Sequence, residues 1–232
     1  NSAMGTIALI KQTFMDAEWY MRAWGAYEDG GRSVLPPETS EALGALEAAV
    51  MGSQPVIFET GSEEEYLRAH KLAQDYGVDA WYRGSGQEYR IVDVLRGRTD
   101  PLIIPLSFPD APEVDDPESA LNATLADLRD WYLAPTSPAQ LADAGVSFAI
   151  TSDGLSSLNE FLPNLRIAVA RGLSTRDALA ALTTTPAALL GLENTHGTIA
   201  EGRVANLVVS QGDLFTEEAA VRDVWVHGQA YE

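Results

Sequence analysis

Histidine is the side chain that most often binds a catalytic metal, and this chain has three histidines and no cysteine. A catalytic zinc or similar ion needs about three protein ligands that converge from several strand ends. His70 falls in the middle of an expected helix, His196 in a linker and His227 in the last expected strand. We therefore interpret each as a surface or packing residue rather than a metal ligand. The lack of cysteine also excludes a thiol nucleophile, a disulfide framework and a thiolate zinc site.

Other catalytic motifs are scarce. The sequence has no Gly-x-Ser-x-Gly elbow, no phosphate-binding Gly-x-x-x-x-Gly-Lys loop and no Gly-x-Gly-x-x-Gly fingerprint. Its nearest glycine cluster is Gly84-Ser85-Gly86, which follows an expected strand and precedes an expected helix. These residues could bind an anion through backbone N–H groups, but a tight turn between strand and helix is the favoured interpretation.

The charge excludes two classes of partner. The 232 residues contain 34 acidic and 15 basic side chains, for a net charge of −19, with 46% hydrophobic residues. Binding to nucleic acid or to anionic lipid needs clustered Lys and Arg, so neither partner is expected. No apolar run approaches the roughly 18 residues of a membrane span.

The elements that must position any site are short apolar strands alternating with helices, which is typical of βα units on a parallel sheet. The expected strands are 55–59, 80–83, 102–106 and 146–151. Helices are expected at 63–76 and 88–96, and Ser174 with Asp177 predicts a capped helix over 175–184. The interval between the third and fourth strands is longer than one crossover helix needs. It must hold an insertion, of which the proline-rich residues 108–117 form the loop.

Both ends of the chain differ from this pattern. Residues 3–27 predict an amphipathic helix that carries Trp19, Tyr20, Trp24 and Tyr27. These aromatic side chains could line a pocket, but packing is the more frequent use of such a cluster. Residues 197–232 predict short strands separated by glycine turns, and hence a small β layer appended to the α/β part.

The C-terminal third of the chain resembles the amidohydrolase superfamily, and the whole chain is similar to its imidazolonepropionase-like and prolidase-like branch. The resemblance rests on motifs in the right order over about sixty residues, preceded by a strand that ends on an aspartate. These motifs are Gly172-Leu173-Ser174, Ala178-Leu179, Thr183 to Ala187, Leu190-Gly191-Leu192, Gly197-Thr198-Ile199, Gly202 to Val209 and Val224 to Gly228, and the strand is Ala149-Ile150-Thr151-Ser152-Asp153.

The resemblance implies a metal-dependent hydrolase on a (β/α)₈ TIM barrel joined to a β-sandwich. On its register the four expected strands are the fifth to eighth of the barrel. We therefore expect two domains: residues 1–196 as the C-terminal half of the barrel, and residues 197–232 as part of the small β-sandwich. The family's His-x-His pair on the first strand and the Lys or carboxylate on the fourth are then outside this chain.

The resemblance also assigns the site residues. Asp153 corresponds to the family's catalytic aspartate, a metal ligand that takes a proton from the attacking water. The family's two other barrel histidines correspond to Glu59 and Arg83, which we expect to contact substrate instead. Arg83 cannot coordinate a cation, because it stays protonated and has no free lone pair. We hypothesise that its guanidinium replaces the metal charge and pairs with Glu59 or Asp153, with an Arg83 nitrogen within about 4 Å of the carboxylate.

Two functions follow as expectations. The first is a hydrolase of the C–N bond of a small amide, lactam or dipeptide-like substrate, incomplete in this chain. Its divalent metal, such as zinc, would be bound only if the missing half completes the site. The alternative is a non-catalytic, degenerate amidohydrolase domain that serves packing or partner interaction. A half barrel has unpaired strand edges, so the expected partner is the N-terminal half of the barrel, another chain or a second copy.

Overall fold

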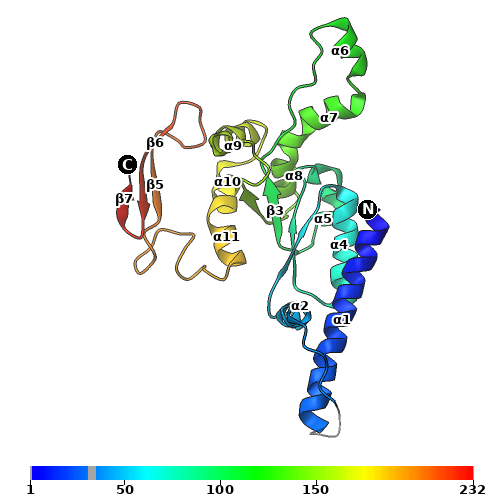
Figure 1. Cartoon of the computed structure of the whole chain (residues 1–232). Coiled ribbons are helices and arrows are strands. Elements are labelled where there is room, and N and C mark those ends of the chain that lie inside the picture. Colours follow the sequence, from blue (N-terminus) through cyan, green and yellow to red (C-terminus); the bar gives the residue numbers. More distant parts are fainter. Residues whose placement is uncertain (1, 31–34, 232) are drawn as a thin grey trace. The chain divides into compact units, whose positions relative to one another are not determined.

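The computed structural model describes residues 2–30 and 35–231, and Figure 1 shows the order of their helices and strands. The helices are α1 (Ala3–Gly30), α2 (Glu41–Gly44), α3 (Glu47–Val50), α4 (Glu63–Tyr76), α5 (Val92–Leu95), α6 (Pro117–Asn122), α7 (Leu125–Leu133), α8 (Ser137–Asp143), α9 (Phe161–Ala170), α10 (Thr175–Leu182) and α11 (Thr184–Leu189). The strands are β1 (Val56–Glu59), β2 (Ala80–Arg83), β3 (Leu102–Pro105), β4 (Phe148–Thr151), β5 (Leu207–Gln211), β6 (Ala220–Val226) and β7 (Gln229–Tyr231). None of the described helices combines the length and the hydropathy that crossing a bilayer requires.

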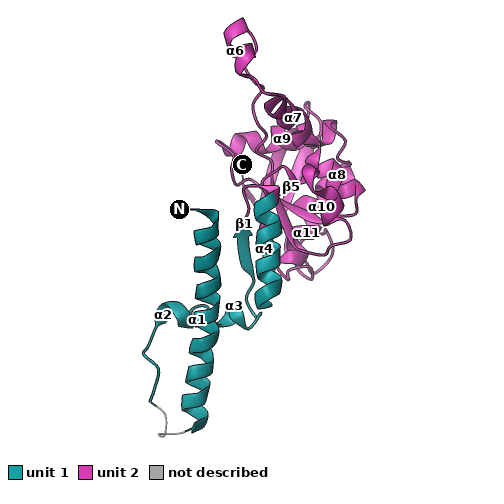
Figure 2. Cartoon of the chain, turned by 90° about the vertical axis from the view of Figure 1, so that its right-hand side faces the viewer, with its two compact units in different colours: residues 1–58, 64–81 teal, residues 59–63, 82–232 magenta. Residues whose placement is uncertain are grey.

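The chain divides into two compact units, which Figure 2 colours separately. Unit 1 comprises Asn1–Phe58 and Glu64–Trp81, and unit 2 comprises Glu59–Glu63 and Tyr82–Glu232. The predicted division at residues 196 and 197 is a different one and stays a prediction. All the candidate site residues belong to unit 2.

Unit 1 is built around one face of the long helix α1. Phe14, Ala17 and Tyr20 recur every three residues and are buried, as the amphipathic pattern predicts. Phe14 stacks on Tyr76 of α4, with ring centroids 5.5 Å apart, and packs in a cluster with Leu72, Ala73 and Val78. The predicted bounds of α4 are confirmed.

The barrel-type strands hydrogen-bond in the order β1-β2-β3-β4. β2 pairs in parallel with β3, and β3 pairs in parallel with β4, with Ile103 opposite Ala149. The mixed α/β fold with a parallel sheet is therefore confirmed. All four strands lie at the predicted positions, although β4 begins two residues later than expected.

Helices α8, α9 and α10 lie around β3 and β4 in unit 2 (Figure 1). Leu106, Leu141 and Leu165 are completely buried there. Ser174 caps α10 by accepting a hydrogen bond from Asp177 N, as its spacing predicts. This apolar core holds the strands in place. Polar residues lie at the carboxyl ends of these strands.

The insertion after β3 is an extended segment followed by α6 and α7, which project from the rest of unit 2 (Figure 2). Sequence analysis predicted its loop but not these two helices. Asp116 caps α6, and Thr124 with Asp127 forms a capping box on α7. Both helices begin at strong caps, yet neither buries a residue.

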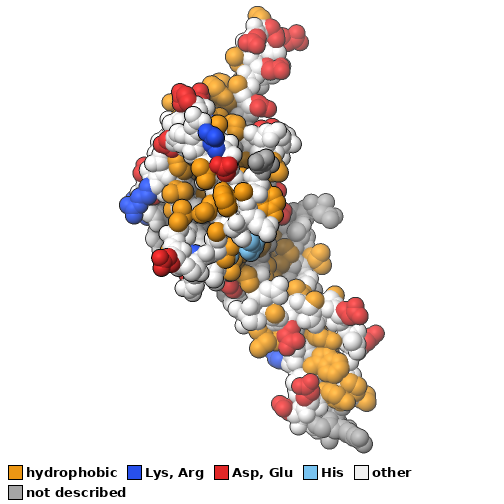
Figure 3. All heavy atoms as spheres, turned by 90° about the vertical axis from the view of Figure 1, so that its left-hand side faces the viewer, with side chains coloured by type: hydrophobic (Ala, Val, Ile, Leu, Met, Phe, Trp, Pro, Cys, Tyr) orange, Lys and Arg blue, Asp and Glu red, His pale blue; other side chains and the backbone are white. Residues whose placement is uncertain are grey.

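The predicted β layer is a three-stranded antiparallel sheet, β5-β6-β7. His227 does not lie in a strand as predicted. With Gly228 it forms the two-residue turn between β6 and β7, where both residues have positive φ. The sheet is largely exposed, and Figure 3, which faces its side of unit 2, shows many hydrophobic side chains at the surface.

Candidate functional site

The central feature of the site is an ion pair between Arg83, the last residue of β2, and Asp153, just after β4. Arg83 Nη2 lies 2.7 Å from Asp153 Oδ2, which confirms the expected distance below 4 Å. Asp153 remains 63% exposed on its side chain, whereas Arg83 is 23% exposed. The pair is therefore accessible from solvent on the carboxylate side.

Gly154 allows these groups to approach one another. Its φ of +84° favours glycine, and a Cβ at this position would lie 3.0 Å from Arg83 Nη2 and 3.2 Å from Ser107 Oγ. Ser107 comes two residues after the end of β3. The ends of β2, β3 and β4 therefore meet at this glycine.

The rest of the Arg83 side chain is held by the protein. Nη1 donates to Gly84 O at 3.2 Å, and Thr60 donates to Arg83 O through both its backbone N and its hydroxyl. Within the described residues, the buried Nε has no hydrogen-bond partner. These contacts fix the guanidinium beside Asp153.

Glu59 ends β1 and is exposed, but it takes no part in the ion pair. Of the two carboxylates predicted as partners of Arg83, the structure thus brings Asp153 to it and leaves Glu59 apart. The substrate-contacting role of Glu59 and Arg83 stays a prediction, as does the catalytic role of Asp153.

The glycine cluster Gly84-Ser85-Gly86 is already occupied by the carboxyl group of Glu88. Glu88 Oε1 accepts from Ser85 N at 2.6 Å, from Gly86 N at 3.2 Å and from Ser85 Oγ at 3.3 Å. Burial raises the pKa of Glu88, and its hydrogen bonds offset that effect only in part. The cluster is therefore a tight turn closed by an internal carboxyl group, as the favoured interpretation predicts.

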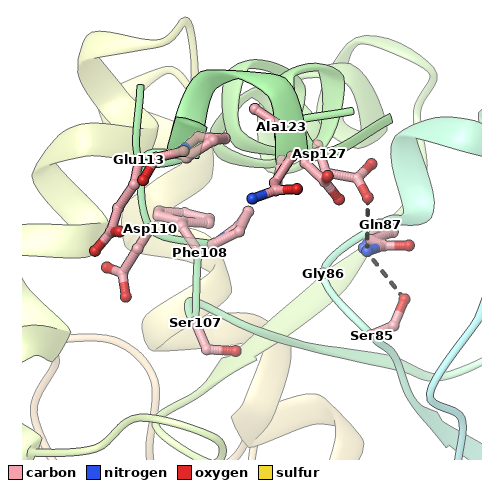
Figure 4. Close-up of a pocket in the computed structure, with 15 residues that line it drawn as sticks. Ser85, Gly86, Gln87, Ser107, Phe108, Asp110, Glu113, Ala123 and Asp127 are labelled. Carbon is pink, nitrogen blue, oxygen red and sulfur yellow. Dashed lines mark hydrogen bonds between the residues drawn. The ribbon is translucent and has the colours of Figure 1, made fainter. Parts of the chain in front are cut away.

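A cleft of about 730 Å³ adjoins the ion pair and shares Ser107 with it. One wall is Ser85 to Gln87 after β2, and the other is the insertion from Ser107 through α7 (Figure 4). Its acidic lining residues are Asp110, Glu113, Asp127 and Asp130. The sequence predicted the loop at residues 108–117 but not the role of Asp127 and Asp130. No local signal in the sequence indicates that α7 lies beside the residues that follow β2.

Asp130 attaches α7 to the segment that follows β2. It accepts hydrogen bonds from Tyr89 Oη, Arg90 Nη2 and Gln87 Nε2. Burial would raise the pKa of Asp130, but the hydrogen bonds of Tyr89 and Arg90 outweigh it and hold that pKa below its usual range. Arg90 also pairs with Glu63, which completes a five-residue polar network.

The donor set does not fit a divalent metal. Within residues 2–30 and 35–231, no group of three or more His, Asp or Glu side chains is arranged to bind one. Asp153, which the resemblance assigns as a metal ligand, contacts the guanidinium of Arg83 instead. His70 stacks on Tyr66, and His196 Nδ1 lies 2.8 Å from the hydroxyl of its neighbour Thr195.

The sequence of the C-terminal part matches a known family model. Residues 136–231 match the model of the amidohydrolase family. This segment resembles the amidohydrolase family. It includes β4 and Asp153, whereas Glu59 and Arg83 precede it. The amidohydrolase resemblance seen in the motifs is thereby confirmed.

Solved amidohydrolase structures share the fold. One is an amidohydrolase from Thermotoga maritima, with 24% identity, a TM-score of 0.78, and coverage of 99% of this chain and 56% of its own. A prolidase complexed with N-methylphosphonate-L-proline has 21% identity, a TM-score of 0.59, and coverage of 84% and 50%. A Xaa-Pro dipeptidase with bound methionine has 19% identity, a TM-score of 0.56, and coverage of 87% and 51%.

The chain therefore spans about half the length of the solved structures that it matches. Among curated proteins, none matches the sequence.

Proposed function

We propose that the chain is a non-catalytic amidohydrolase domain, in which an internal Arg83–Asp153 ion pair replaces a metal centre and whose role is binding. In this proposal β1 to β4 are the fifth to eighth strands of the barrel, and β5 to β7 are part of the β-sandwich. The 2.7 Å contact between Arg83 Nη2 and Asp153 Oδ2 carries the proposal.

The chemistry of the pair supports this choice. A carboxylate that takes a proton from water needs a free oxygen facing that water, whereas Oδ2 of Asp153 is already in contact with Arg83 Nη2 at 2.7 Å. Arg83 cannot serve as a metal ligand in its place, because a guanidinium has no free lone pair. The pair therefore favours a structural or ligand-orienting site.

A second candidate is a hydrolase of the C–N bond of a small amide, lactam or dipeptide-like substrate, with Asp153 as proton acceptor. Two observations favour it: Asp153 lies within the amidohydrolase segment, and its side chain is largely exposed. The metal ligands would then have to come from residues outside this chain, because the described residues do not provide them.

Metal analysis and hydrolysis assays separate the two candidates. We expect the purified protein to contain no stoichiometric divalent metal after incubation with Zn²⁺, and to hydrolyse neither Xaa-Pro dipeptides nor small lactams. One bound metal per chain, together with hydrolysis that Asp153→Asn abolishes, would overturn the proposed function and establish the second candidate.

The partners of the proposed half barrel are the missing barrel half, another chain or a second copy. β1 and β4 are the end strands of the described four-stranded sheet, and exposed strand edges favour pairing with further backbone. Light scattering of the purified chain tests this point. A compact, stable monomer at all concentrations would contradict the need for such a partner.

A further inference from the structure

The cleft beside the ion pair is large enough for a small molecule. Its volume of about 730 Å³ lies within the range of roughly 300–1,000 Å³ typical of ligand sites. Phe108, Pro109 and Pro112 supply apolar surface, while Ser107, Gln87 and Asn122 supply uncharged polar groups. Such a mixture of apolar walls and a few polar groups is common in sites that bind small organic ligands.

The charged groups of the cleft all have the same sign. Its described lining contains four carboxylates and no Lys, Arg or His. Asp127 is engaged in the capping box of α7, and Asp130 in the network with Arg90, but Asp110 and Glu113 form no ion pair with any residue that the structure describes. Figure 4 shows these two side chains next to Phe108 on one side of the cleft, opposite Asp127.

The backbone groups that could bind an anion here are already occupied. Ser85 N and Gly86 N belong to the cleft wall, and both donate to the buried Glu88 carboxyl group. Glu88 is only 5% exposed, and its Oε2 has no hydrogen-bond partner among the described residues. An anionic ligand would therefore find carboxylates but no free N–H cradle on this wall.

The arginines near the cleft are already paired with other carboxylates. Arg83, beside the cleft, pairs with Asp153, and Arg90 is bound to Asp130 and Glu63 and lines a separate, smaller cavity with Arg96. Among the described residues, Asp110 and Glu113 thus have no ion-pair partner, and they lie beside Phe108. Carboxylates next to an aromatic side chain form an environment that favours an organic cation, which can also be attracted to the ring.

From this geometry we propose that the cleft binds a small organic cation, an alkylammonium or oligoamine, whose charge lies between Asp110 and Glu113 and whose alkyl part packs on Phe108. The proposal goes beyond the proposed function and does not depend on whether the protein hydrolyses a substrate.

Calorimetric titration of the whole chain with spermidine tests the proposal, with glutarate as an anionic probe of similar length. We expect saturable binding of spermidine near one per chain and no binding of glutarate. The double variant Asp110→Asn/Glu113→Gln should bind spermidine at least about tenfold more weakly, a loss of about 1.4 kcal/mol, because it removes both charge-assisted contacts.

A matched control separates a site from general attraction to an acidic protein. Glu217→Gln/Glu218→Gln removes the same charge from two exposed positions outside the cleft and should change the affinity less than twofold. Equal losses in both double variants, no spermidine binding, or glutarate binding would each overturn the proposal. Circular dichroism of each variant verifies that the fold is retained. Because this experiment measures neither metal content nor hydrolysis, its failure is distinct from failure of the proposed function.

Discussion

At the scale of single residues, the site depends on the small space that Gly154 leaves between two strand ends. Arg83 reaches Asp153 across this glycine, and Ser107 approaches from the third strand. Any side chain at residue 154 would have to displace one of these groups. The ion pair is thus a consequence of backbone geometry as much as of charge.

Gly154→Ala should therefore disrupt the ion pair and destabilise the protein. A left-handed φ costs a non-glycine residue about 1–2 kcal/mol, and contact of the new methyl group with Arg83 Nη2 should add about 1 kcal/mol. Gly145→Ala is the matched control, because Gly145 has a φ of +74° but no heavy atom within 4 Å of the Cβ position. Urea unfolding measures both free energies of unfolding. Equal losses in the two variants would show that the packing around residue 154 adds nothing.

Glu88 predicts a defined pH dependence of stability. Its pKa is raised in the folded protein above the ordinary value of 4.5, so folding favours the protonated carboxyl group. The stability that this group contributes is fully present below pH 4.5 and is lost as pH rises through the folded pKa. Relative to Glu88→Gln, the wild-type protein should lose free energy of unfolding as pH rises above about 4.5.

Urea unfolding at a series of pH values measures that difference, and the exposed Glu218→Gln serves as the control for general charge effects. A constant difference between wild type and Glu88→Gln across the series would contradict a raised Glu88 pKa.

At the scale of elements, the carboxylate of Asp130 links helix α7 to the segment after β2, and Arg171 also lies over the ring of Tyr132 in the same helix. Asp130 accepts three side-chain hydrogen bonds from that segment, while no residue of α7 is buried. The position of this wall of the cleft therefore depends on a polar network rather than on an apolar core. Elements with few buried apolar contacts open at low free-energy cost.

Asp130→Asn should release α7 without unfolding the rest of unit 2. An amide cannot reproduce the ion pair with Arg90, so amide hydrogens in residues 117–133 should exchange faster, while those of β3 and β4 keep their protection. Hydrogen exchange with mass spectrometry makes this comparison. Arg129→Gln, at an exposed position of the same helix, should leave the exchange rates unchanged. Unchanged exchange in Asp130→Asn would show that other contacts hold α7.

At the scale of the whole molecule, the dominant property is the net charge of −19. Its carboxylates repel one another, because the few basic side chains neutralise only a minority of them. The whole chain has 15 basic residues, and two of them, Arg83 and Arg90, are paired with Asp153 and Asp130 in the candidate site. The remaining acidic surface makes the protein's stability sensitive to ionic strength.

Sodium chloride should therefore raise the unfolding temperature. Increasing its concentration from ~20 mM to ~500 mM shortens the Debye length from roughly 20 Å to about 4 Å and screens the repulsion among surface carboxylates. Differential scanning calorimetry measures the transition, and potassium chloride should act equally, since screening does not depend on which monovalent cation is present. A lower or unchanged unfolding temperature would contradict the argument.

The sequence by itself determined much of the local structure and the resemblance of the C-terminal part to the amidohydrolase family. Hydrophobic periodicity located α4 and the four parallel strands, and the Ser174–Asp177 spacing located the start of α10, because these signals act within a few residues. The motifs between Gly172 and Gly228 identified the amidohydrolase segment. The family resemblance also singled out Glu59, Arg83 and Asp153, which lie at or just after the ends of expected strands.

Only the tertiary structure decided which of these groups meet. Whether Arg83 pairs with Glu59 or Asp153 depends on strand register and on the space at Gly154, which no local pattern encodes. The same holds for Asp130 beside Arg90 and for the cleft between the β2 end and the insertion. Local signals fix which residues form each element, but contacts between distant segments are selected by the packing of the whole core.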